Sequence, residues 1–409
     1  MTDTESPATT FAELGVDADL VDALEAEGIT TPFEIQELTL EAAIAGRDIT
    51  GKAKTGSGKT LAFGIPMIER VGAAEPRRPH GLILVPTREL AGQVTKALKP
   101  LLAARDLTAV AVYGGAPMGP QIKALEKGAS IAIATPGRLI DLMERAALDP
   151  SHISIVAIDE ADQMADMGFM PQVRTVMAKL PDQRQTFLYS ATLDHQVKEL
   201  IDRYMTDPVQ FEVESPTETV DTMEHRFLKV HYMDKAKVVA SLAKLNDRIL
   251  AFTRTKAGAD RVAKDLRGIG VACAPIHGDL PQNKREQSLR RFADGEIKVL
   301  VATNVAARGL HIDGVDVVVH YDPPDDPKTY LHRSGRTARA GEEGLVVTLV
   351  EWDQVNEVLG IQRRADLNVP IIKMFSNDDR LADLAGWTPP PEEAPFKEKA
   401  LKRRRRGGF

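Results

Sequence analysis

The stretch AKTGSGKTLAFGIPMI, residues 53–68, decides the fold class of the first half of the chain. Its beginning matches a phosphate-binding loop, except that Ala53 stands where a first glycine is usual. Two glycines let the backbone wrap around phosphates, Lys59 can reach the β- and γ-phosphates, and the Thr60 hydroxyl can bind Mg²⁺. A flexible glycine turn with a stray lysine is the alternative, which the apolar helix start that follows disfavours. The predicted nucleotide-binding residues of this loop are Ala53, Lys54, Thr55, Gly56, Ser57, Gly58, Lys59 and Thr60.

Short β-branched runs alternate with longer segments of helical period from about residue 50 onward. This alternation is typical of parallel βαβ units with both faces of the sheet covered. It occurs in two series, so we expect an α/β protein with two tandem domains. The predicted strands are 81–87, 108–115, 130–137, 154–162 and 185–192, then 248–255, 271–278, 297–303, 315–322 and 344–350, and the predicted helices in the first series are 88–99, 120–127 and 137–145.

Acidic residues end the buried-type strand in SIVAIDEAD, residues 154–162. Open α/β sheets place functional groups at the carboxyl ends of their strands. We expect Asp159 to hold Mg²⁺, directly or through water, and Glu160 to orient or deprotonate the attacking water. A solvated acidic loop is the alternative, and the phosphate-binding loop upstream makes it the weaker one.

Three arginines, Arg333, Arg336 and Arg339, recur at a spacing of three in HRSGRTARAG, residues 332–341. On a helix this spacing would align them on one face. They belong to the second series, so we expect them to reach a nucleotide only across an interdomain cleft, as arginine fingers. A solvated basic helix start is the alternative.

The composition of the 409 residues is that of ordinary globular domains, with 43% hydrophobic and 27% charged residues. No apolar run is long enough to span a bilayer, and a single cysteine excludes an internal disulfide, so we expect a cytoplasmic protein without a membrane segment. The net charge of -7 is uneven, because residues 1–46 hold eleven acids and no Lys or Arg, whereas residues 397–409 hold seven cations and one acid.

Taken in order, these motifs resemble those of DEAD-box ATP-dependent RNA helicases of superfamily 2, in their compact bacterial form. The resemblance runs from about residue 11 to residue 350. It implies two RecA-like domains that bind ATP between them and RNA across both. Besides the loop and the arginines, it rests on GITTPFEIQ (28–36), PTREL (86–90), Gly114 and Gly115, TPGRL (135–139), DEAD (159–162), SAT (190–192), HGDLPQNKR (277–285) and TNVAARGLHI (303–312).

The resemblance also implies roles for single residues. Gln36 would read adenine, and Phe11 would stack or pack near the base, although Phe11 also suits an ordinary core aromatic. The strand-end hydroxyls of Ser190 and Thr192 would couple the ATP state to strand separation, or simply satisfy backbone groups. The implied RNA contacts are Thr87, Arg88, Gly115, Thr135 and Arg138, then Gly278, Arg285 and Thr303, and the implied coupling residues are Asp162, Ser190, Thr192, His332 and Arg333.

Four positions depart from the family pattern, namely Ile29, Phe33, Asn304 and His311. The family usually has an aromatic residue at the first of these positions and Ser or Thr at the second. It usually has Asp at the third and at the fourth. The change at His311 matters most, because the family carboxylate normally touches the nucleotide or its ribose. We therefore expect weakened nucleotide affinity, but retained activity.

The predicted organisation has five parts, with a polar linker at VESPTETVD and a proline-containing basic tail expected to be disordered. The tail would tether RNA electrostatically, or serve only as a solubilising end. The parts are an N-terminal segment with the adenine-reading motif (1–40), an ATP-binding domain (41–212), the linker (213–221), a second RecA-like domain (222–370) and the tail (371–409).

The sequence thus predicts a monomeric, Mg²⁺-dependent RNA-stimulated ATPase that unwinds RNA locally. Hydroxyls, backbone amides and arginines suit phosphate and 2′-OH groups, so RNA would be bound largely without regard to sequence. An ATP-gated RNA clamp with little unwinding and a DNA helicase are the alternatives. No motif identifies a protein partner.

Overall fold

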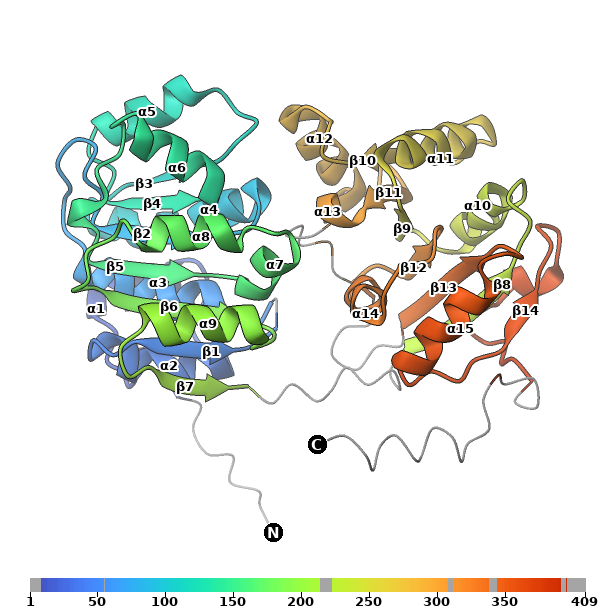
Figure 1. Ribbon diagram of the computed structural model, residues 1–409, viewed down its shortest axis with the longest axis horizontal. Coiled ribbons are helices and arrows are strands. Elements are labelled where there is room, and N and C mark those ends of the chain that lie inside the picture. The colour runs from blue at the N-terminus through green and yellow to red at the C-terminus, as the bar shows by residue number, and fades with distance from the viewer. Residues whose placement is uncertain are drawn as a thin grey trace, which may run out of the picture. The chain divides into compact units, whose positions relative to one another are not determined.

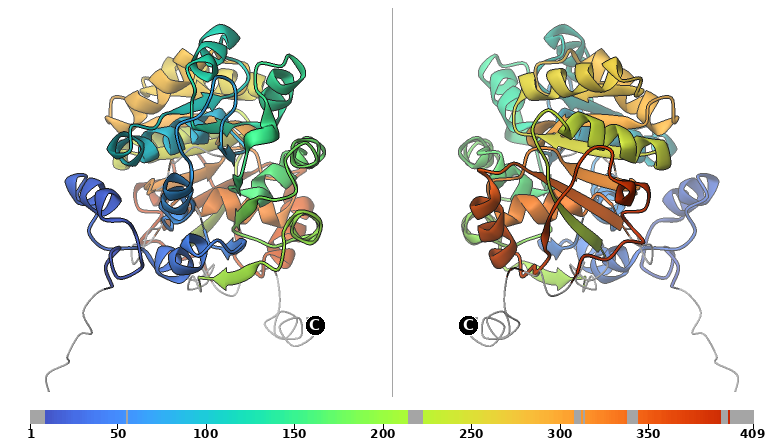
Figure 2. Two further views of the ribbon diagram at one scale, coloured as in Figure 1. Left: turned by 90° about the vertical axis from the view of Figure 1, so that its left-hand side faces the viewer. Right: turned by 90° about the vertical axis from the view of Figure 1, so that its right-hand side faces the viewer.

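The computed structural model describes residues 9–54, 56–213, 223–307, 312, 314–337, 344–390 and 395. The chain divides into two compact units, residues 1–215 and 216–409. In each unit helices cover both faces of one sheet (Figures 1 and 2). This confirms the predicted fold class, an α/β protein with two tandem parallel sheets.

The first unit has a seven-stranded parallel sheet in the order β3-β4-β2-β5-β6-β1-β7. Its strands are β1 (Ile49–Lys52), β2 (Gly81–Leu84), β3 (Ala109–Val112), β4 (Ile131–Ala134), β5 (Ile155–Ile158), β6 (Gln185–Ser190) and β7 (Val209–Glu212). Its helices are α1 (Ala18–Ala26), α2 (Glu34–Ile44), α3 (Lys59–Arg70), α4 (Arg88–Ala104), α5 (Met118–Glu126), α6 (Pro136–Glu144), α7 (Ala161–Asp166), α8 (Met170–Met177) and α9 (His195–Tyr204), with a 3₁₀ turn at Pro150–His152.

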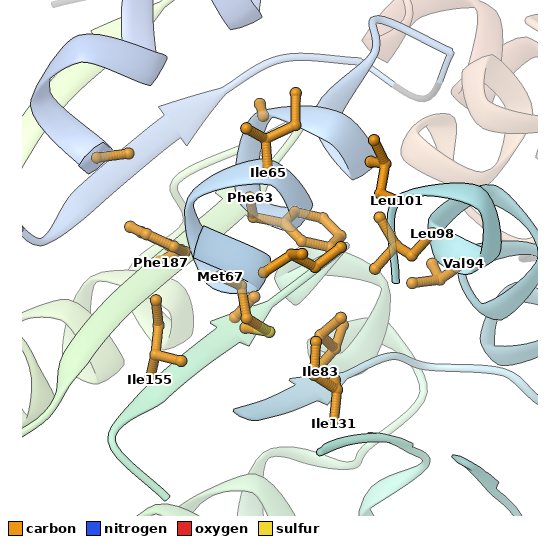
Figure 3. Close-up of a cluster of buried hydrophobic side chains, with 14 of the residues drawn as sticks. Phe63, Ile65, Met67, Ile83, Val94, Leu98, Leu101, Ile131, Ile155 and Phe187 are labelled. Atoms are coloured by element: carbon orange, nitrogen blue, oxygen red, sulfur yellow. The ribbon is translucent and has the colours of Figure 1, made fainter. Parts of the chain in front are cut away.

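Two apolar clusters, one on each face, hold this sheet between its helices. Successive strand residues point to opposite faces, so Ile83 joins one cluster while Leu82 and Leu84 join the other. Helices α3 and α4 approach closely at Gly64, where a Cβ would lie 2.3 Å from Leu98 Cδ2. Figure 3 shows the first cluster, in which α3 and α4 pack on the strands through Phe63, Ile65, Met67, Ile83, Val94, Leu98, Leu101, Ile131, Ile155 and Phe187.

The second unit repeats this plan with a seven-stranded sheet in the order β10-β11-β9-β12-β13-β8-β14. All neighbouring strands are again parallel. Its strands are β8 (Met223–Lys229), β9 (Ile249–Thr253), β10 (Cys273–Ile276), β11 (Val299–Thr303), β12 (Val317–His320), β13 (Gly344–Val350) and β14 (Ile371–Lys373). Its helices are α10 (Lys235–Leu245), α11 (Lys256–Gly268), α12 (Gln282–Ala293), α13 (Asn304–Ala307), α14 (Pro327–Ser334) and α15 (Val355–Arg364), with the 3₁₀ turn η3 (Asp379–Ala382).

The second unit extends beyond residue 370, so the predicted disordered tail begins too early. Strand β14 pairs with β8, and Leu381 and Leu384 are buried in the core. The buried Arg226 donates from Nε to the Leu384 carbonyl and from Nη2 to the Ala385 carbonyl. The proline-rich composition of this stretch predicted disorder, although Leu381 and Leu384 are buried in it. Residues 396–409, with the basic run, lie outside the described residues, as do residues 214–221 of the predicted linker.

In the part of the chain that the structure describes, no helix is both long and apolar enough to cross a membrane.

Candidate nucleotide and RNA site

Strands β1, β5 and β6 are neighbours in the first sheet. The phosphate-binding loop follows β1, the DEAD segment follows β5, and the SAT segment begins at the end of β6. Because the three strands are parallel, these segments meet at one edge of the sheet. The Ala53 amide donates to the Ser190 carbonyl over 3.0 Å, which joins the first segment to the third directly.

The phosphate-binding loop turns into helix α3 through two glycines with positive φ. Gly56 has φ 85° and Gly58 has φ 89°, a left-handed conformation that side chains oppose. Lys59 opens α3 and is buried; its Nζ donates to the Ala53 carbonyl over 3.2 Å and lies 3.9 Å from Asp159 Oδ1. The ammonium group therefore already lies inside the loop where phosphates would be bound. Thr55 lies outside the described residues.

The predicted adenine-reading residue, Gln36, is fully buried against this loop. Its Nε2 donates to the Gly58 carbonyl over 2.8 Å, and its Oε1 accepts from the Phe33 amide over 2.9 Å. The amide thus fixes the start of α2 to the start of α3 and keeps one further donor and acceptor position. Phe11 packs in the core and is 2% exposed, which fits an ordinary core aromatic; its packing near the base stays a prediction.

Asp159 and Glu160 lie at the carboxyl end of β5, and both are buried. Asp159 Oδ1 accepts from the Glu160 amide over 2.9 Å. Burial raises the pKa of Asp159 to about 7, an effect that nearby Lys59 opposes and Glu160 reinforces. A buried carboxylate beside Lys59, which opens the helix that also carries Thr60, fits a divalent cation, which would offset the cost of its charge.

Among the described residues no group of three or more His, Cys, Asp or Glu side chains could hold a metal. Asp159 and Thr60 remain the residues that the sequence predicts to hold Mg²⁺. This suits a cation that commonly uses one or two protein ligands together with phosphate oxygens and water.

The predicted coupling residues of the first unit form one hydrogen-bonded cluster. Asp162 Oδ2 accepts from the Thr192 amide over 3.2 Å and from its hydroxyl over 3.4 Å. Ser190 Oγ accepts from the Asp162 amide over 3.1 Å and donates to the Thr192 carbonyl over 2.7 Å. The DEAD and SAT segments are therefore bonded through side chains that are not needed to hold phosphates.

The predicted RNA contacts of the first unit follow β2, β3 and β4, the other half of the same sheet. Thr87 caps α4 by accepting from the Leu90 amide, and Thr135 precedes α6. The Arg88 guanidinium lies against Gly115, where a Cβ would be 2.6 Å from Nη1. Arg138 Nη1 donates to the Ala116 carbonyl over 3.2 Å. These residues lie at the carboxyl ends of β2, β3 and β4. Thr87 and Arg138 also hold the neighbouring backbone by hydrogen bonds.

Gln121 was not identified from the sequence. It accepts from Arg138 over 3.3 Å and donates to the Tyr113 carbonyl over 3.1 Å, which ties α5 to the loop after β3. No residue pattern marks this role, because it depends on a contact across 17 residues.

In the second unit Gly278 follows β10, Thr303 ends β11, and Arg285 is buried on α12. They lie in the half of the sheet that corresponds to the predicted RNA half of the first unit.

Arg333 and Arg336 do not share one helical face as predicted. Helix α14 ends at Ser334 and Gly335 caps it, so Arg336 lies in the turn that follows. Arg333 is buried, with Nη1 donating to the Asp322 carbonyl over 2.9 Å and Nε to Asn304 Oδ1. His332 is exposed on α14, and Arg339 lies outside the described residues, as does His311. The spacing of three was interpreted as continuous helix, although Gly335 is of the residue type that commonly ends helices.

Two stretches of the chain match known families. Residues 33–200 match the DEAD/DEAH box helicase family and residues 231–341 match the helicase conserved C-terminal domain. The chain is 39% identical over 363 residues to the mitochondrial DEAD-box ATP-dependent RNA helicase 9 of Arabidopsis thaliana, covering 86% of this chain and 59% of that protein. It is 38% identical over 375 residues to the DEAD-box ATP-dependent RNA helicase CshA of Geobacillus kaustophilus, covering 91% and 80%.

A solved structure, S. cerevisiae Dbp5 bound to RNA and ADP BeF3, matches with a TM-score of 0.79 and 29% identity, covering 92% of this chain and 98% of that one. The fold and the phosphate-binding loop define a nucleotide-binding protein with tandem RecA-like domains. The chain belongs to the DEAD-box RNA helicase family, and its bacterial relative supports the bacterial type. It spans 59% of the length of the Arabidopsis relative.

Proposed function

We propose that this chain is an RNA-stimulated ATPase that unwinds RNA duplexes locally, with ATP and Mg²⁺ as cofactors. The observation that carries this proposal is that the segments at the carboxyl ends of β1, β5 and β6 contact one another. Lys59 and Asp159 lie 3.9 Å apart, and the same segments continue through Asp162 to Ser190 and Thr192. A change in nucleotide state at the first pair therefore has a bonded path to the rest of the edge.

Each group at this edge has a defined task in the proposed reaction. Lys59 would neutralise the β- and γ-phosphates, and Asp159 with Thr60 would hold the metal. Bound Mg²⁺ supplies charge neutralisation at the phosphoryl group. Glu160 would accept a proton from, or orient, the attacking water, and Arg336 would stabilise the developing charge once ATP and RNA bring the units together. Phosphoryl transfer needs positioning and charge more than covalent catalysis.

RNA would be held through its backbone by both units. The proposed contacts in the first unit are hydroxyls, glycine amides and arginines, which meet phosphates and 2′-OH groups. Such groups carry no base code, so we infer largely sequence-independent binding. We also propose that the chain acts as a monomer in the cytoplasm, a reducing compartment that suits the free and buried Cys273.

The test is ATP hydrolysis by the whole chain with RNA and with DNA of the same sequence, together with strand displacement on an RNA duplex. We expect stimulation by RNA, little stimulation by DNA, and displacement that requires ATP. Equal stimulation by DNA would favour a DNA helicase. RNA retention that depends on ATP without displacement would favour an RNA clamp.

A Lys59→Ala variant serves as the negative control. It should lose nucleotide affinity, because it removes the cation from the loop.

A further inference from the structure

The second unit contains a counterpart of the Lys59–Asp159 pair. Since the two sheets have the same strand order, β8 corresponds to β1 and β12 to β5. Lys235 opens the helix after β8 as Lys59 opens the helix after β1, and Asp322 follows β12 as Asp159 follows β5. The ammonium and carboxylate lie 3.8 Å apart in the second unit and 3.9 Å apart in the first.

The counterpart is closed to phosphate, because the protein uses its cation internally. Lys235 is 1% exposed; its Nζ donates to the Tyr321 carbonyl over 2.9 Å and lies 2.7 Å from Glu351 Oε1. The residues before it, VHYMD at 230–234, contain no glycine with which to wrap a phosphate. Lys59 faces the phosphate-binding loop, whereas its counterpart Lys235 is held inside the second unit by protein oxygens. We call Lys235 with Asp322 and Glu351 the anchor.

This anchor is bonded to the arginines that follow β12. The Asp322 carboxylate accepts from the Arg254 amide over 2.8 Å, and the Asp322 carbonyl accepts from Arg333 Nη1 over 2.9 Å. The Arg336 amide in turn donates to the Arg333 carbonyl over 3.3 Å, and its own carbonyl accepts from the Val315 amide over 3.2 Å. A short bonded path therefore leads from Lys235 to the backbone of Arg336.

We propose that Lys235, held by Glu351 and Asp322, is a positioning residue for ATP hydrolysis that fixes the segment 321–326 and, through Arg333, the turn bearing Arg336. The proposal rests on the proposed function. Removal of the ammonium leaves two partly buried carboxylates without their shared cation, so the segment they hold should shift. The segment carries no nucleotide-binding residue of the first unit, so ATP affinity should not change.

The test is a Lys235→Met variant of the whole chain, which keeps the length of the side chain and removes its charge. We expect kcat of RNA-stimulated hydrolysis to fall about tenfold or more, while the affinity of the nucleotide stays within about twofold, as for a group that acts only in the transition state. Glu351→Gln should show the same split in a milder form. The assay is run well below the thermal midpoint of each variant, so a purely structural role would leave kcat unchanged.

The matched control is Lys298→Met. Lys298 pairs with Asp247 at 2.8 Å, and both residues precede strands of the same sheet, at its opposite edge. This exposed pair should be dispensable for kcat. If Lys235→Met does not fold, Glu351→Gln decides the outcome by the same measurement.

A double-mutant cycle with Arg336→Ala identifies the route. If Lys235 acts through Arg336, Lys235→Met should cause little further loss in the Arg336→Ala chain, whereas independent effects would multiply and would overturn the proposed route. If the parent chain is active and both Lys235→Met and Glu351→Gln keep its kcat, the inference is overturned but the proposed function is not. A parent without RNA-stimulated hydrolysis would overturn the proposed function, and the inference with it.

Discussion

Glu160 has the backbone of a left-handed residue, with φ 52° and ψ 49°. A non-glycine residue pays about 1 to 2 kcal/mol for this conformation. The other described non-glycine residues with positive φ are exposed, whereas Glu160 is 3% exposed and caps α7. Strain retained at a buried acidic side chain beside Asp159 indicates a functional constraint rather than a tolerated surface turn.

Glu160→Gln should nearly abolish ATP turnover and leave ATP binding intact, because the amide keeps the size of the side chain but cannot accept the proton of water. The variant should accumulate as a complex with ATP and RNA, measured by retention of labelled RNA beside single-turnover hydrolysis. Hydrolysis at the parent rate would remove Glu160 from the mechanism.

Helix α14 is tied to its sheet by a buried stack of aromatic and imidazole rings. His225 Nδ1 on β8 lies 2.7 Å from the Tyr330 hydroxyl, and the rings of His320 and Tyr330 stack with centroids 4.7 Å apart. Burial, with Arg226 nearby, lowers the pKa of His225 to about 4, and burial, with Arg333 nearby, lowers the pKa of His320 well below its usual value. Both imidazoles are therefore neutral at pH 7.

Acidification should destabilise the second unit. The pKa of His225 is lower in the folded than in the unfolded chain, so its contribution is complete above about pH 6.5 and is lost as the pH falls toward 4. This amounts to about 2 kcal/mol between pH 7.5 and pH 5, and His320 acts in the same direction. Trp352 and Trp387 are the only tryptophans and lie in the second unit, so their fluorescence during urea unfolding reports on it alone.

His225→Gln is the control for this measurement. It should reduce the loss of stability between pH 7.5 and pH 5 by about 2 kcal/mol, because its amide does not titrate in this range. An unchanged pH dependence would mean that other groups carry it.

Strands and helices differed in how well their sequences predicted them. GLVVTLV at β13 is apolar throughout and was predicted with its observed limits. Strands β1, β7, β8 and β14 were not predicted, because each of them carries polar residues. The polar residues of β8 are buried by particular partners, such as Tyr330 for His225. Local pattern cannot supply such tertiary contacts.

The parts of the candidate site that come directly after strands could be predicted from the sequence. The phosphate-binding loop, Asp159 and the SAT segment meet because β1, β5 and β6 are neighbours. The sequence could not show that Gln36 is buried against Gly58, nor that Lys235 repeats the place of Lys59. Both facts depend on which strands are adjacent, and strand order is set by the whole sheet rather than by any segment.

Arg336→Ala should lower RNA-stimulated hydrolysis of the whole chain by about 10³-fold, the lower end of the effect of arginine fingers, and leave the affinity of the whole chain for ATP unaffected. The reason is that Arg336 belongs to the second unit, whereas Lys59 and Asp159 belong to the first. Titration of labelled nucleotide and steady-state hydrolysis check the two halves of the prediction. Full RNA-stimulated hydrolysis by the isolated first unit would contradict it.

Deletion of residues 397–409 removes seven cations and one acid from the whole chain. Since each neutralised phosphate releases counterions, the truncated chain should bind RNA more weakly at low salt, and its log affinity should fall less steeply with log salt. The residues at the sheet edge remain, so saturating RNA should restore most of the turnover and the change should appear mainly as a higher RNA requirement. RNA affinity measured at several salt concentrations for both forms decides the matter, because identical slopes would show that the basic run takes no part in RNA capture.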